Sequence, residues 1–308
     1  MTTFNKLEMD MLNKVADLHE IPVGAYNIRN NGFAAARQST ANIEIMSKPD
    51  CDGIDIFIKP GTVNESVHIP VIIMETGVKE CVYNDFHIGH DSDVVIVAGC
   101  GIHNCGDQES VHDGIHRFFV GKNAKVKYIE KHYGDGDGNG QRTMNPTTVI
   151  EMNENSYMEM ETVQIKGVDS TQRVTKATLK DDAILVIGEK IFTHGKQYAG
   201  TEFEVDLQGE HCSAHVISRS VATDDSHQAF VSKVYGNNLC TGHTECDAII
   251  MDNGKVTAVP EIRANHPDAT LIHEATIGKI AGEQLIKLMT LGLTEKEAEE
   301  QIVTGFLK

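Results

Sequence analysis

The stretch Asn123-Ala124-Lys125-Val126-Lys127-Tyr128-Ile129 decides the fold, because its pattern recurs along the chain. A turn residue is followed by a small residue and then by apolar residues that alternate with other types. The spacings between successive starts are 32, 27, 30 and 56 residues, and the last is about twice 28. Such a period predicts the stacked coils of a solenoid or β-helix. The later copies begin at Asn155-Ser156, Asp182-Ala183, Cys212-Ser213 and Asp268-Ala269.

Short β-rich runs fill the chain from about residue 40 to 262, as at residues 54–58, 94–97, 125–129 and 183–187. Gly, Asn and Asp turns separate them instead of helical patterns of 10 to 15 residues. Alternating βαβ units, and with them a Rossmann fold, are therefore disfavoured. A β-sandwich has a similar density of strands and remains the alternative to a β-helix.

Helical patterns occur only near the two ends of the chain. Apolar residues at helical spacing predict a short amphipathic helix at the start (Phe4, Leu7, Met11, Val15 and Leu18) and two more at the end (Ile280, Leu285, Leu288 and Leu291; then Ala298, Ile302 and Phe306). Gly292 is suited to end the first of the closing pair, and Thr294 with Glu297 forms a capping box for the second.

The predicted organisation has three parts: an N-terminal helical segment (residues 1–39), a β-helix core (40–275) and a C-terminal helical segment (276–308). A terminal helical pair usually packs on its own core, and binding of a partner is the alternative.

The charge of the chain excludes several classes of partner. Its net charge of -18 repels the phosphates of nucleic acid and an anionic membrane surface. No apolar run approaches the roughly 20 residues of a membrane helix, and the start lacks the layout of a signal peptide. We therefore expect a cytoplasmic protein, whose seven cysteines are free thiols.

Known catalytic and metal-binding motifs are absent or incomplete in this chain, which restricts its chemistry. The chain has no G-x-x-x-x-G-K-[ST] and no G-x-S-x-G, so ATP-dependent work would belong to another subunit. The run at residues 134–140 (GDGDGNG) resembles the start of a calcium loop, but Pro146 stands where a bidentate Glu is needed. A surface turn is the preferred interpretation.

Soft and borderline metal ligands form two groups in the sequence. The first group could hold a metal, or could be a polar loop with small buried thiols; a zinc hydrolase using His103, His112 and His116 is a further alternative. Its members are Cys100, His103, Cys105, His112 and His116.

The second group joins the run at residues 239–247 to the run at 271–275, about 28 residues later. If one coil takes about this many residues, Cys246 lies near Glu274. The site would bind a metal or cluster; the alternative is a structural cysteine with a charged pair.

The segment from Cys246 to Phe306 resembles the C-terminal signature of the SufB/SufD family of iron-sulfur cluster assembly scaffolds. The matching elements occur in the family's order: CDAIIM (246–251), AVPEI (258–262), HEAT (273–276), GKI (278–280) and IVTGF (302–306). A weaker match at GKNAKV (121–126) extends the resemblance over residues 40–308.

This resemblance implies a right-handed parallel β-helix with terminal helices that holds a transient iron-sulfur cluster for apoprotein acceptors. It further implies a homodimer formed through the last coils, and a SufC-like ABC ATPase bound through the C-terminal helical segment. The family's scaffold cysteine and glutamate map onto Cys246 and Glu274, and the sister subunit's histidine maps onto His273. Cys240 has no counterpart and is a candidate extra ligand.

Two departures from the family pattern concern sulfur delivery. The chain lacks most of the long N-terminal region of larger members, and their sulfur-accepting cysteine corresponds approximately to Phe119. Free sulfide could serve instead. The rival function is a structural subunit that organises the ATPase and holds no metal.

Overall fold

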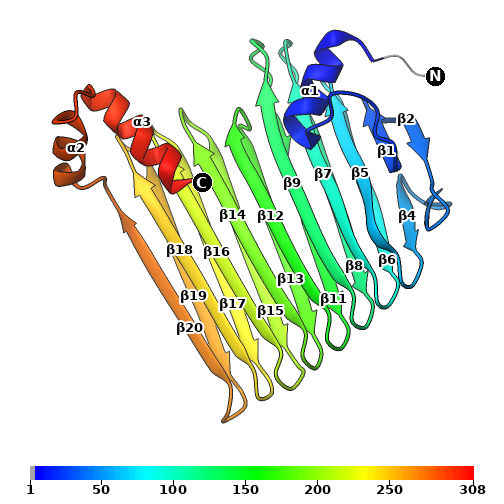
Figure 1. Cartoon of the computed structure of the whole chain (residues 1–308). Helices are drawn as coiled ribbons and strands as arrows, with labels where there is room; N and C mark the ends of the chain where they lie inside the picture. Colours follow the sequence, from blue (N-terminus) through cyan, green and yellow to red (C-terminus); the bar gives the residue numbers. More distant parts are fainter. Residues whose placement is uncertain (1–3) are drawn as a thin grey trace.

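The repeated pattern folds into stacked coils, as the sequence predicts (Figure 1). The computed structural model describes residues 4–308, apart from the side chain at position 166. It is a mainly β protein with 57% of its residues in strands, a parallel β-solenoid of about eight turns, and short helices at both ends. The β-helix prediction is confirmed, and the sandwich alternative is wrong. None of the helices in the described range combines the length and apolar composition needed to cross a membrane.

Each coil contributes one strand to each of two sheets. The first sheet has the spatial order β2 (Phe33–Gln38), β1 (Ala25–Asn30), β5 (Val63–Ile73), β7 (Asp93–His103), β9 (Lys125–Asp135), β12 (Tyr157–Lys166), β14 (Ile184–Thr193), β16 (Ser213–Ala222), β18 (Thr241–Ile250) and β20 (Thr270–Gly278). The second has the order β19 (Lys255–Ala264), β17 (His227–Gly236), β15 (Tyr198–Leu207), β13 (Ser170–Leu179), β10 (Arg142–Met144), β8 (Ser110–Val120), β6 (Lys79–Ile88), β4 (Gly53–Ile58) and β3 (Ile43–Ser47), with β11 (Thr147–Met152) also between β8 and β13.

The turn residues of the pattern make one corner of each coil. Asn123 and Asn155 have positive φ angles of 59° and 55°, a conformation that Asn tolerates better than most residues. Their side chains form a ladder in which Asn155 Nδ2 donates to Asn123 Oδ1 at 2.9 Å. The copy near residue 212 is shifted by one, because His211 has the positive φ and Cys212 is the buried small residue. The skipped copy lies at Cys240, which takes the equivalent buried position.

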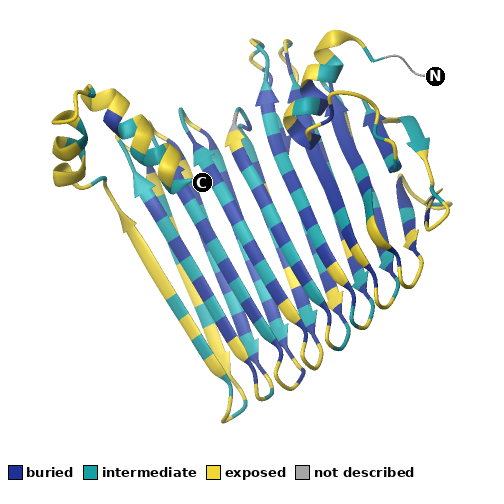
Figure 2. Ribbon diagram, in the orientation of Figure 1, coloured by how far each residue is buried: buried dark blue, intermediate teal, exposed yellow. Residues whose placement is uncertain are grey.

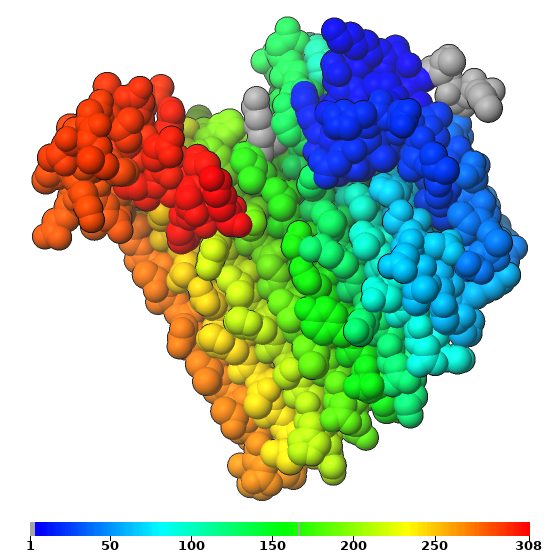
Figure 3. Space-filling view, viewed as in Figure 1, coloured from blue at the N-terminus to red at the C-terminus, as the bar shows by residue number. Residues whose placement is uncertain are grey.

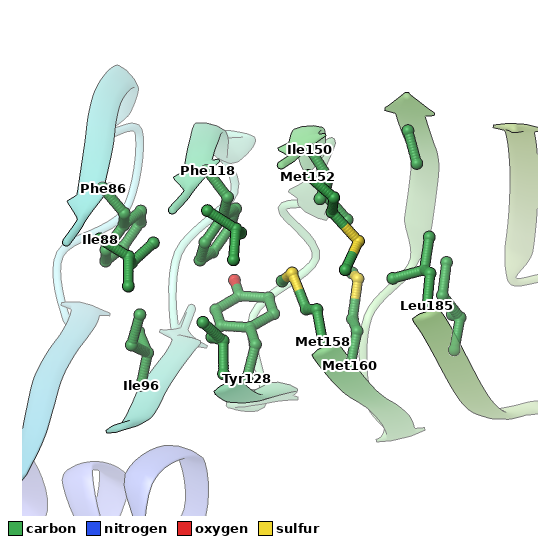
Figure 4. Packing of buried hydrophobic residues seen from close by; sticks show 14 of the residues in the cluster. Phe86, Ile88, Ile96, Phe118, Tyr128, Ile150, Met152, Met158, Met160 and Leu185 are labelled. Carbon is green, nitrogen blue, oxygen red and sulfur yellow. The ribbon is translucent and has the colours of Figure 1, made fainter. Parts of the chain in front are cut away.

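The core lies between the two sheets, where every second side chain points inward (Figure 4). Phe86 and Phe118, on neighbouring coils, stack with ring centroids 4.5 Å apart, and Tyr128 packs edge-on against Phe118 at 4.9 Å. All three side chains are fully buried. Stacked rings of this kind add about 0.5–1.5 kcal/mol to the gain from burial alone.

The N-terminal helix α1 (Lys6–Ala16) packs on the outer face of the first sheet, over β5, β7 and β9 (Figure 1). It buries Met11, Leu12 and Val15 against the first sheet, and it approaches β7 closely because residue 99 is glycine. A Cβ atom there would lie 2.2 Å from the carbonyl oxygen of Val15. The predicted segment 1–39 is only partly helical, since β1 and β2 also fall within it; residues 1–3 lie outside the described range.

The C-terminal end is much more exposed, as Figure 2 shows for β20 and α2. Helix α2 (Gly282–Met289) buries no residue, and α3 (Glu295–Phe306) buries only Ala298. Both helices form a lobe beside the solenoid (Figure 3). Gly292, with φ of 99°, separates them, and the capping box of Thr294 and Glu297 is present as predicted.

Candidate functional site

Cys246 lies in the middle of β18 and points into the solenoid, where its side chain is 1% exposed. Its neighbours along the stack are Ser218 in the coil before and Ala275 in the last strand. Burial, with further contributions from the charges of Glu189 and Asp247, raises the pKa of the Cys246 thiol to about 12. In this structure the thiol is therefore protonated near neutral pH, and a metal ion would have to displace that proton.

An inward row of polar residues ends at Cys246. Glu130, Thr162, Glu189 and Ser218 occupy the same position in four successive coils before it. Ser218 Oγ donates to Glu189 Oε2 at 2.8 Å, so the residue beside the thiol is itself anchored.

Glu274 does not lie beside Cys246. Its partner in β18 is Glu245, because this coil contains 29 residues and Cys246 pairs with Ala275. A shift of one residue in a strand moves a side chain to the other face, so Glu274 points outward with 67% of its side chain exposed. Its closest basic neighbour is His243, with Nε2 3.8 Å from Glu274 Oε2. The expected contact between the two side chains within one chain is wrong.

His273 shares the inward face with Cys246. Its Nδ1 lies 2.7 Å from Thr244 Oγ1 across the β18–β20 ladder. Two residues of strand rise and one strand spacing separate the Cα atoms of His273 and Cys246, which corresponds to about 8 Å. Burial, and then the nearby His243, lowers the pKa of His273, which favours the neutral imidazole that binds metals.

Cys240 is held away from the other three candidates. It occupies a corner of its coil, 2% exposed, and packs in the apolar core. Six residues of extended strand separate it from Cys246, which corresponds to about 20 Å. Cys240 and Cys246 therefore cannot bind one ion within a chain, and the corner position explains the cysteine as a small buried residue.

The five residues of the first candidate metal group lie in two separate places in the structure. Cys100, His112 and His116 lie inside the solenoid, whereas His103 and Cys105 lie at the carboxyl end of β7. His112 Nδ1 pairs with Glu80 Oε1 at 3.0 Å, and His116 Nδ1 with the Tyr128 hydroxyl at 2.7 Å.

These contacts anchor the imidazoles in a buried polar network, which also contains the ion pair between Arg173 and Glu130. His103 is outside that network, so the zinc hydrolase that required all three histidines is not supported.

Among the described residues, one set of three His, Cys, Asp or Glu ligand atoms lies within 4.8 Å: Asp55, Asp85 and His87. The Lys48 ammonium already neutralises both carboxylates, at 2.5 and 2.8 Å, and Arg117 binds Asp85 as well. This set is therefore an ion-pair network on the outer face of the second sheet, in which Asp85 is buried. The second sequence group does not form a preassembled metal site within one chain.

The sequence patterns did not identify His215 and His243 as neighbours near the candidate site. The rings stack with centroids 4.8 Å apart, and the Nε2 atom of each is buried without a hydrogen-bond partner. Their separation of 28 residues, equal to the length of that coil, is the signal that could have paired them.

The position that corresponds to the family's sulfur-accepting cysteine faces outward. Phe119 belongs to an aromatic stack in which His87 lies between it and Phe57, with centroid distances of 5.1 and 4.5 Å.

Comparisons with known proteins identify the family of this chain. A family profile described as SUF system FeS cluster assembly, SufBD core domain, matches residues 79–306. The chain belongs to the SufBD family of iron-sulfur cluster assembly proteins. The matched range contains Cys246, His273 and Glu274 but not α1.

Three archaeal SufBD family proteins illustrate the similarity. An iron-sulfur cluster assembly SufBD family protein of Archaeoglobus fulgidus is 29% identical over 263 residues, which cover 84% of this chain and 69% of that protein. Relatives with the same description in Methanocaldococcus jannaschii and Pyrococcus horikoshii are 28% and 30% identical. They match 78% and 75% of this chain, and 76% and 69% of their own lengths.

Proposed function

We propose that this SufBD family chain is a scaffold subunit on which iron-sulfur clusters are assembled, with Cys246 as the thiolate ligand. The observation that carries the proposal is the position of Cys246, which is covered on its open side by the single strand β20. Movement of that strand would expose the thiol together with His273. Neither residue catalyses a reaction of its own in this proposal, and the cluster is the cargo that passes to apoproteins in the cytoplasm.

Two copies would complete the site across their last coils. The edge strands expose apolar side chains that suit contact with a second copy: Val259 (50% exposed), Ile262 (41%), Ile272 (48%) and Ile277 (37%). In such a homodimer Glu274 of each copy would lie at the shared edge. There its carboxylate would bind iron held by Cys246 of the other copy, which it cannot do for Cys246 of its own chain. Cys240 is not part of this proposal.

An ABC-type ATPase would bind the lobe formed by α2 and α3. The exposed apolar residues Ile286, Met289 and Leu291 on and after α2 support this assignment, because a helical pair packed on its own core would bury them. ATP binding by the partner would pull the lobe, and β20 leads directly into α2. Force on the lobe would therefore reach the strand that covers Cys246.

The test is anaerobic reconstitution with ferrous iron and sulfide. Cys246→Ser should lose most of the cluster absorbance, because serine does not replace a thiolate toward iron. Cys240→Ser is the matched control, since it changes a buried cysteine in the same coil, and it should retain the absorbance. Full loading of Cys246→Ser would contradict the ligand assignment. Absence of metal from the anaerobically purified wild type and its ATPase complex, with no loading on reconstitution, would favour the rival function as a structural subunit.

A further inference from the structure

Three side chains beside α1, at the carboxyl ends of β7 and β9, form a hydrogen-bonded series outside the site described above. Cys105 Sγ lies 3.0 Å from His103 Nε2, and His103 Nδ1 lies 2.6 Å from Asp135 Oδ1. His103 ends β7, Asp135 ends the neighbouring strand β9, and Cys105 is exposed two residues beyond β7. The series places a nucleophile, a base and an orienting carboxylate in the order that activated thiols require.

The hydrogen bonds define which nitrogen accepts a proton. A carboxylate can only accept, so Asp135 fixes the tautomer of His103 with its proton on Nδ1. Nε2 is then the acceptor, and it faces the thiol of Cys105. Transfer of the thiol proton produces a thiolate beside an imidazolium, whose charge Asp135 stabilises.

The N-terminal helix holds the carboxylate in place. Lys14 of α1 binds Asp135 Oδ2 at 3.1 Å and lies 4.4 Å from the centre of the Tyr133 ring. Partial burial opposes ionisation of Asp135, but the hydrogen bonds from His103 and Lys14 prevail and lower its pKa. Asp135 is therefore charged at neutral pH, which the arrangement requires.

The loop that carries Cys105 is anchored by a fully buried asparagine. Asn104 Nδ2 donates to the carbonyl of Gln108 at 2.8 Å, and Asn104 Oδ1 accepts from the backbone of Gly106 at 3.1 Å. Gly136 packs against it, with φ of 105°, and a Cβ atom there would lie 2.3 Å from the Asn104 carbonyl oxygen. The glycine-rich run that resembles a calcium loop thus supports the Cys105 loop. A polar hollow of about 460 Å³ adjoins it, lined in part by Asp135 and Gly136.

Cys105 differs from the other cysteines of the chain. Cys100, Cys212, Cys240 and Cys246 are buried. The other exposed thiols are Cys51 and Cys81. Among the cysteines of residues 4–308, Cys105 is the one that forms a hydrogen bond with a histidine.

We propose that Cys105, with His103 as its base and Asp135 as a positioning residue, accepts sulfane sulfur from a persulfide donor. This inference rests on the proposed function, because cluster assembly consumes sulfur and the site would supply it. The Cys105 thiolate attacks the terminal sulfur of R–S–SH, a new S–S bond forms, and the bond between the two donor sulfurs breaks. The donor leaves as R–S⁻ and takes the proton held by His103. One persulfide and one thiol are converted to one thiol and one persulfide, so no oxidant is needed.

The first experiment measures thiol reactivity in the reduced full-length protein by mass spectrometry of each cysteine peptide after iodoacetamide labelling. Cys105 should react about tenfold faster than Cys51 near neutral pH, because His103 accepts the thiol proton of Cys105. His103→Gln should remove that advantage. His90→Gln is the matched control, because His90 pairs with Asp91 at 2.6 Å in an exposed position and should leave the rate unchanged. Equal labelling rates for Cys105 and Cys51 would overturn the proposal.

The second experiment separates this inference from the scaffold function. Glutathione persulfide should add one sulfur atom to Cys105 of the wild type at least tenfold faster than to Cys51 or Cys81. Cys105→Ser should lose this uptake and still load a cluster from ferrous iron and inorganic sulfide. Uptake spread evenly over the three exposed cysteines, or loss of sulfide-dependent loading in Cys105→Ser, would overturn the sulfur-acceptor role. Failure of the wild type to load from sulfide would count against the scaffold function alone, since sulfur uptake is measured without iron.

Discussion

The two ends of the solenoid differ in how well their core-facing side chains are buried. At the N-terminal end, the edge strand β3 buries its core-facing Ile43 and Ile45 at 0% and 5% exposure, and α1 covers the outer face of the first sheet over β5, β7 and β9. At the C-terminal end, β19 and β20 leave the core-facing Ile262 and Ile277 at 41% and 37% exposure. Repeat proteins need a cap at each end to protect the stacked core. The N-terminal end is closed within the chain, and we call the coils from β1 to β9, which include the sheet face under α1, the capped half. The difference supports a second copy as the cover of the other end.

Buried charge is also distributed unequally. Arg29, Glu80, Glu130 and Arg173 lie inside the capped half or at its boundary, each at most 9% exposed. Glu130 is paired with Arg173, which lies between it and Glu189. Buried ion pairs tolerate little movement, because losing one partner leaves an uncompensated charge. Opening the coils around these ion pairs should therefore cost more free energy than opening the last coils, which contain Cys246.

The largest expected effect compares the cores of the two regions. Phe86→Ala in the capped half should lower the free energy of unfolding by about 3–5 kcal/mol, because Phe86 is fully buried and its partner ring Phe118 would face a cavity. Ile272→Ala at the open edge should cost less than about 1 kcal/mol in the monomer, since half of that side chain is already in water. Chemical denaturation at low protein concentration measures both. Equal losses would show that the open edge is as well packed as the core.

The next effect concerns association through the open edge. Ile272→Glu should weaken dimerisation at least about 100-fold, because the interface would have to bury an unpaired carboxylate. Ile184→Glu is the matched control: this isoleucine is similarly exposed, at 41%, but lies in the middle of the first sheet. Sedimentation velocity reports the change. A dimer that survives Ile272→Glu, or that Ile184→Glu disrupts, would place the contact elsewhere.

The third prediction concerns pH and the capped half. Burial lowers the pKa of His116 from 6.5 to about 4, although Glu130 opposes the shift. Between these values the unfolded chain binds more protons than the folded one, so stability falls as the pH falls. We expect a loss of about 2 kcal/mol from this group between about pH 7.5 and 5.

Hydrogen exchange at the two pH values, corrected for the intrinsic rate, should locate this loss in the strands around β8 and β9. His116→Gln should reduce the pH dependence, whereas the exposed control His90→Gln should not. A loss centred on β19 and β20 instead would contradict the assignment.

The smallest effect compares the two capping boxes. Asn5→Ala and Thr294→Ala each remove an N-cap hydrogen bond and should cost about 1 kcal/mol of local stability. The consequence should be greater for α3, which buries only Ala298, than for α1, which is fixed by tertiary packing. Amide exchange in the first turn of each helix measures the difference. Equal exchange in both variants would mean that packing of α1 does not restrain its first turn.

The fold could be predicted from the sequence because its signals are local. Asn123, Asn155 and Asp182 mark corners, and the residues after them alternate with a period of two. The site was harder, because coil length varies and a contact between coils depends on the exact count. The coil from β16 to β18 has 28 residues, whereas the next coil, from β18 to β20, has 29. Because of this one additional residue, Cys246 pairs with Ala275 and not with Glu274. The pairing of Arg173 with Glu130 had no sequence signal, since an inward polar residue in an alternating strand resembles an outward one.

The order of the coils along the chain, from the closed end to the open edge, sets the order in which they become available during synthesis. Chains emerge from the ribosome N-terminus first, at about 5–20 residues per second. Helix α1 and the first coils are available before any later coil, so each new strand can add to an edge that is already ordered. The uncovered edge of β20 appears after all the other strands, which shortens the time during which nascent chains expose it to one another.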